Sequence, residues 1–140
     1  MERQRLVATV VSAERLIWLK ELRGKTADFY TKMDVQINHL ERPVDKSNPQ
    51  ALQQLLDSYA EQAVSLSHAI FPMLNSTKEH QKALSTAIND TLGFMNSIVG
   101  KKTFEALAID KRPYAKLKTD AFKALEEIGV KAWGKVRGLE

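Results

Sequence analysis

The sequence LQQLLDSYAEQAVSLSHAIFPM, residues 52–73, has the clearest periodic pattern in the chain and decides its fold class. Its apolar side chains recur at alternating steps of four and three residues, at Leu52, Leu56, Tyr59, Ala63, Leu66, Ile70 and Met73. This spacing places them along one side of an α-helix, which must be buried against another element. Asn48 and Pro49 suit the start of the helix and Pro72 suits its end, so we expect a helix over about 49–74.

The preceding segment has a similar pattern over about 4–40. Its apolar residues are Val7, Val11, Trp18, Leu22, Phe29 or Tyr30, Met33, Ile37 and Leu40, with Glu14 and Thr26 at the two missing steps. Gly24 is the weak point, because a glycine inside a helix costs about 1 kcal/mol relative to alanine, and a helix end near Arg23 is the alternative. The apolar side stays in phase across Gly24, so we predict one continuous helix.

Two further helices are expected, over about 77–99 and 113–135. The first follows a capping-box sequence at residues 76–79 and precedes Gly100, and the second begins with Pro113. Their apolar positions are Leu84, Ile88, Thr91, Met95 and Ile98, and then Tyr114, Leu117, Ala121, Leu125, Ile128, Ala132 and Val136. Phe104, Leu107 and Ala108 indicate a short accessory helix over about 103–109. We therefore predict a single all-α domain, residues 1–140, that forms an antiparallel four-helix bundle with an over-long first helix.

The first helix would reach roughly 55 Å and the other three roughly 33 to 38 Å, at 1.5 Å per residue. Its surplus end carries Val7, Val10, Val11, Ile17 and Trp18. Leaving such a patch in water is unfavourable, so we expect either the connector around Phe104 or a second protein chain to cover it. Phe122 and Trp133, eleven residues apart on the last helix, suggest a ledge for a protein partner, and the simpler alternative is that they pack on the first helix.

Residue types that carry chemistry are scarce. The chain has no cysteine, and none of His39, His68 and His80 has an acidic residue three positions before it, as a carboxylate-bundle metal site requires. Gly100-Lys101-Lys102-Thr103 lacks the earlier glycine of a phosphate-binding loop. We therefore predict no catalytic residue, no metal and no cofactor. His68, on the polar side of its helix, leaves phosphoryl transfer as an architectural alternative.

Charge and composition limit the remaining functions. The net charge is +4, and residues 101–140 hold ten Lys/Arg against six Asp/Glu. A basic stripe on the last helix comprises Arg112, Lys116, Lys123, Lys131 and Arg137. The stripe could follow a phosphate backbone, although the interleaved Asp120 and Glu127 are equally typical of a salt-bridged solvent surface.

No stretch approaches the roughly 20 apolar residues of a membrane span, and the N-terminus does not resemble a signal peptide. We expect a cytoplasmic protein that does not enter a membrane. The sequence favours a non-enzymatic role in protein–protein interaction or assembly, with a protein partner or a homo-oligomer. The alternative is a nucleic-acid-binding subunit of a larger complex.

Overall fold

The computed structural model describes residues 2–42, 49–99 and 109–137, which form four α-helices and one short 3-10 turn, with no strand among them. The elements are α1 (Glu2–Glu41), α2 (Pro49–Ile70), η1 (Phe71–Met73), α3 (Glu79–Val99) and α4 (Arg112–Arg137). The all-α bundle with an over-long first helix is confirmed, since α1 has 40 residues and the other helices have 21 to 26. The accessory helix expected at 103–109 falls almost wholly on residues 100–108, outside the described part of the chain.

The helix ends differ from expectation by a few residues. α2 ends at Ile70 rather than near Leu74, because Pro72 lies in a 3-10 turn and Leu74 adopts an extended conformation. α3 begins at Glu79 rather than residue 77. The Asn75 side-chain oxygen accepts hydrogen bonds from both the backbone N–H and the hydroxyl of Thr77, at 3.0 and 2.7 Å. The backbone N–H of Lys78 also donates to the Asn75 carbonyl at 3.0 Å, so residues 75–78 form a turn and the helix begins after it.

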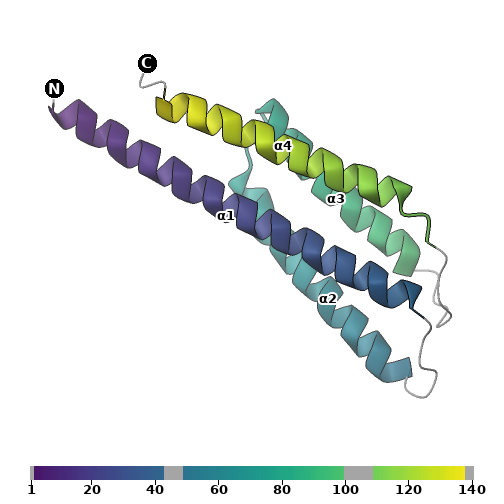
Figure 1. Ribbon diagram of the computed structural model, residues 1–140. Helices are drawn as coiled ribbons and strands as arrows, with labels where there is room; N and C mark the ends of the chain where they lie inside the picture. The colour runs from purple at the N-terminus through teal and green to yellow at the C-terminus, as the bar shows by residue number, and fades with distance from the viewer. Residues whose placement is uncertain (1, 43–48, 100–108, 138–140) are drawn as a thin grey trace.

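α1 is continuous through Gly24, as the phase of its apolar side predicts. The Trp18 indole N–H donates to the Met73 carbonyl at 3.0 Å, and the His39 ring stacks on Tyr59 with centroids 5.8 Å apart. Residue numbers on α2 therefore fall as those on α1 rise, and the two helices run in opposite directions (Figure 1).

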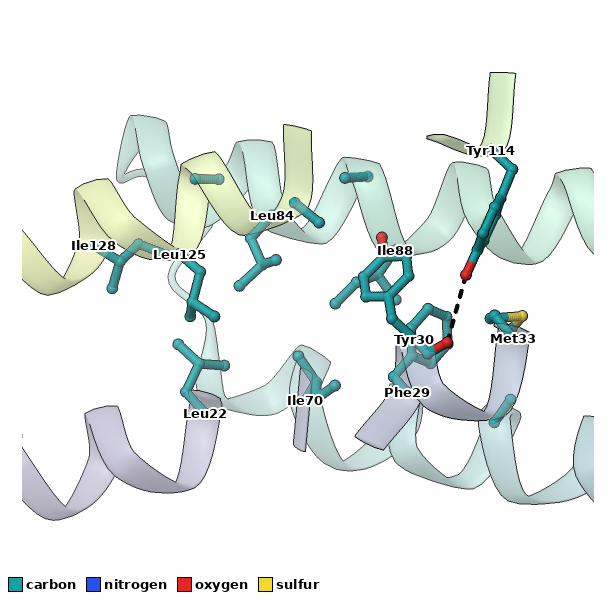
Figure 2. Packing of buried hydrophobic residues seen from close by; sticks show 14 of the residues in the cluster. Leu22, Phe29, Tyr30, Met33, Ile70, Leu84, Ile88, Tyr114, Leu125 and Ile128 are labelled. Carbon is teal, nitrogen blue, oxygen red and sulfur yellow. Dashed lines mark hydrogen bonds between the residues drawn. The ribbon is translucent and has the colours of Figure 1, made fainter. Parts of the chain in front are cut away.

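The core lies where all four helices meet. Figure 2 shows Leu22 of α1, Ile70 of α2, Leu84 of α3 and Leu125 of α4 converging between the helices. Further along, the Tyr114 hydroxyl donates a long hydrogen bond to the Tyr30 carbonyl, at 3.4 Å. Residues from every helix are thus buried together in one cluster, which explains why each helix needs an apolar side.

The two ends of the bundle differ in how many helices they contain. α2 ends beside Trp18, so the part of α1 before Trp18 extends past α2, with the C-terminal part of α4 alongside it (Figure 1). A hollow of about 400 Å³ at this end is shared by Arg15 of α1, Gln81 of α3 and Ala132 of α4. α4 is therefore the neighbour that lies along the surplus end of α1, and the Phe104 connector is outside the described residues.

Candidate interaction surface

Large apolar side chains that are well exposed gather on two of the four helices. Among the side chains that the structure describes they are Val10, Val11 and Ile17 of α1, Leu55 and Val64 of α2, and Phe122, Val130 and Trp133 of α4. Six of these eight belong to α1 and α4, which lie side by side. An apolar patch that spans two adjacent helices is a stronger interaction signal than single exposed residues scattered over a surface.

Three contacts fix the register of α1 against α4. A Cβ at Gly129 would lie 2.4 Å from Arg23 Nη2, the rings of Tyr30 and Phe122 are 5.5 Å apart, and Lys118 Nζ is 2.8 Å from Asp34 Oδ2. From one of these pairs to the next, the residue number rises on α1 by as much as it falls on α4, so the two helices are antiparallel with a constant offset. Continuing this register places Trp133 at the level of residue 19 and Glu126 at the level of residue 26.

The same contacts show which side of α1 faces α4 and which side of α4 faces α1. Successive residues of a helix are about 100° apart around its axis, so the contacts also identify the exposed residues on the adjacent, solvent-facing side of each helix. We call the combined band the α1–α4 face; it comprises Ala13, Ile17, Lys20, Gly24 and Ala27 of α1, and Thr119, Phe122, Glu126, Val130 and Trp133 of α4. Ile17 is 59% exposed and Trp133 is 44% exposed. Val10, 56% exposed, lies two turns before Ile17 on the same side of α1.

The α1–α4 face includes two charged residues, Lys20 and Glu126, among its ten. The exposed side chains of Arg23, between the two helices, and Lys123, beside Phe122, border it. The Arg23 side chain reaches across to α4 and covers Gly129, so it belongs to the junction between the helices. Aromatic residues and arginine are enriched at protein–protein interfaces.

The residues expected to bind a partner differ in how exposed they are to solvent. Val10, Val11 and Ile17 are exposed, whereas Trp18 is half-buried and donates its indole N–H to the Met73 carbonyl, so η1 covers part of the surplus end. The side chain of Val7 lies outside the described part.

The two aromatic residues of the expected ledge lie on the α1–α4 face. Phe122 packs its ring on Tyr30 of α1, as the simpler alternative expected, and is still 37% exposed. Part of its ring therefore remains accessible to a partner. Trp133 is the more exposed of the two.

A polar cluster between α1 and α4 was not anticipated. The Asp34 carboxylate accepts hydrogen bonds from the Tyr114 hydroxyl at 2.5 Å and from Lys118 Nζ at 2.8 Å. Burial, and then the bond to Asp34, raise the pKa of the Tyr114 hydroxyl well above its ordinary value. The phenol therefore stays protonated and holds the two helices in register, which is a structural role. The partners are 80 and 84 positions apart in sequence, and no local pattern connects them.

The basic stripe has acidic neighbours. Lys116, Lys123 and Lys131 are exposed, Arg112 forms a salt bridge with Asp110 at 2.9 Å, and the side chain of Arg137 is outside the described part. Lys123 borders a groove between α3 and α4 whose charged lining residues are Glu79, Lys82, Asp90, Asp120, Lys123 and Glu127. Carboxylates outnumber lysines there, which weakens the attraction for a phosphate backbone. Nucleic-acid binding by the stripe stays a prediction.

The described residues contain no group of three or more His, Asp or Glu side chains that could hold a metal ion. Within the same ranges, no helix has both the length and the apolar character that a bilayer crossing requires. His68 is exposed on α2. Comparisons with family models, curated proteins and solved structures gave no match, so the geometry of the α1–α4 face carries the functional argument.

Proposed function

We propose that this protein acts by binding another protein chain through the α1–α4 face, in an assembly role that involves no catalysis. The observation that supports the proposal is the gathering of exposed apolar side chains on two adjacent helices. Burying a large aliphatic side chain fully contributes about 1.5–3 kcal/mol, so covering the exposed part of Ile17 contributes about 1 kcal/mol or more.

Site-specific photo-crosslinking in the native cells tests this proposal. Benzoylphenylalanine in place of Ile17 should give crosslinked protein adducts, because the probe would lie inside the interface. The matched control has the same probe in place of Val64, which is also exposed but lies on α2. Adducts from position 17 and none from position 64 would support the proposal. No protein adduct from position 17, or equal adducts from both positions, would contradict it.

A further inference from the structure

The hollow shared by α1, α3 and α4 lies outside the α1–α4 face. Its volume of about 400 Å³ is within the range of roughly 300–1,000 Å³ that small-molecule pockets have. Three parts of the chain line it: Arg15 and Trp18 of α1, residues 77–81 at the start of α3, and Ile128, Lys131 and Ala132 of α4. None of these residues belongs to the α1–α4 face, so a ligand bound there would be independent of the proposed protein contact.

Arg15 lies in line with the core of the bundle. It precedes Leu22 by seven residues, which is about two helical turns, so both residues are on the same side of α1. Leu22 is fully buried among the helices (Figure 2), whereas Arg15 is half-buried and lines the hollow. Among the described residues, none forms an ion pair with Arg15. A partly buried charge without a partner is unfavourable, so an anion in the hollow would be stabilising.

The lining of the hollow has an excess of positive charge. Arg15, Lys78 and Lys131 are its cations, and Glu79 is the carboxylate among the described lining residues. Within the described ranges, Lys78 and Lys131 form no ion pair either. With histidine counted as neutral, three cations against one carboxylate leave two positive charges unbalanced. A phosphate monoester carries about 1.5 to 2 negative charges at pH 7 and balances this excess, whereas a carboxylate balances half of it.

The hollow also has an apolar wall, formed by Trp18, Ile128 and Ala132. The indole N–H of Trp18 donates to the Met73 carbonyl at 3.0 Å, which fixes the position of the ring. Ile128 and Ala132 belong to the buried core. Ligand pockets combine such apolar walls with a few charged groups that set the orientation of the ligand. Inorganic phosphate would leave this wall in contact with water, so the ligand that fits carries an apolar group next to its phosphate.

We propose that this hollow binds a small molecule in which a phosphate monoester is attached to an apolar or aromatic group. Arg15, Lys78 and Lys131 bind the phosphate, and Trp18 and Ile128 contact the apolar group. Hydrogen bonds between ionised groups are about twice as strong as neutral ones, so the phosphate contributes most of the specificity.

Nuclear magnetic resonance of the purified full chain, titrated with phenyl phosphate, tests the inference. The chain has two tryptophans, so its ¹H–¹⁵N spectrum contains two indole N–H signals, and Trp133→Phe assigns them. Phenyl phosphate should shift the Trp18 signal in a saturable manner and leave the Trp133 signal in place. Inorganic phosphate and benzyl alcohol each carry half of the required chemistry and should bind at least about tenfold more weakly.

Substitutions in the lining test the role of the cations. Arg15→Gln and Lys131→Gln should each raise the Kd for phenyl phosphate by about tenfold, because each removes a charge-assisted hydrogen bond. Lys116→Gln is the matched control, since Lys116 is exposed on α4 but does not line the hollow, and it should leave the Kd unchanged. Circular dichroism verifies that each variant retains its helices.

Four results would overturn the inference. They are no shift of the Trp18 signal at millimolar phenyl phosphate, a shift of the Trp133 signal alone, equal binding of either half-ligand, and an unchanged Kd in both lining variants. The photo-crosslinking result at position 17 is unaffected by any of them, so the proposed function is tested separately.

Discussion

The central and N-terminal parts of α1 belong to one continuous helix but have different surroundings. In the centre, Leu22, Phe29 and Tyr30 are buried by residues from the other three helices. Nearer the N-terminus, Val10 and Ile17 are more than half exposed, and α4 continues alongside (Figure 1). Both parts contain large apolar residues. The difference is therefore in the neighbours that reach each part, and it separates residues that hold the fold from residues that are free to bind.

The largest expected effect comes from truncating one residue in each part. Phe29→Ala should lower the free energy of unfolding by about 3–5 kcal/mol, because Phe29 is completely buried and its removal leaves a cavity. Ile17→Ala should lower it by less than about 0.5–1 kcal/mol, because the side chain is mostly in water. Urea unfolding followed by circular dichroism, in solutions dilute enough to prevent association, measures both. Equal losses would show that the two parts are packed alike.

A change of pH should have an intermediate effect on the free energy of unfolding, and this effect should come from Tyr30 in the central part of α1. Burial raises the pKa of Tyr30 to about 12, from 10.0 in the unfolded chain. Between these values the folded chain retains a proton that the unfolded chain has lost. The contribution of Tyr30 to stability is therefore complete below about pH 10 and is lost as pH rises toward about 12. The slope is at most about 1.4 kcal/mol per pH unit.

Urea unfolding at a series of pH values checks this expectation against Tyr30→Phe. The Thr91 hydroxyl donates to the Ala87 carbonyl at 2.7 Å, so Thr91 keeps a partner when the Tyr30 hydroxyl is removed. The variant should lose less stability than the unaltered protein between about pH 10 and 12. Parallel curves for the two proteins would show that Tyr30 does not titrate differently on folding.

Periodicity predicted the helices because the signal for each one lies within its own residues. The steps of four and three in residues 52–73 place Ala63 and Ile70 on one side of α2, and both are fully buried. The two polar residues in the apolar spacing of α1 differ: Thr26 is fully buried, whereas Glu14, nearer the N-terminus, is exposed.

The spacing of apolar residues could not predict contacts between helices, because these contacts depend on the register of one helix against another. Asp34, Tyr114 and Lys118 meet only after α1 and α4 have packed at one particular offset. Spacing could place an apolar surplus at the N-terminal end of α1, but it could not show that Trp18 reaches the Met73 carbonyl of η1. The end of α2 at Ile70, forced by Pro72, decides how much of α1 is left uncovered.

The smallest expected effect distinguishes two glycines. Gly24→Ala should raise the free energy of unfolding by about 0.5–1 kcal/mol, because alanine favours the helix and the added methyl group meets open space. Gly129→Ala should gain less, because its methyl group would lie 2.4 Å from Arg23 Nη2 and the guanidinium must move. Urea unfolding of both variants measures this difference. Equal gains would mean that Arg23 does not rest on Gly129.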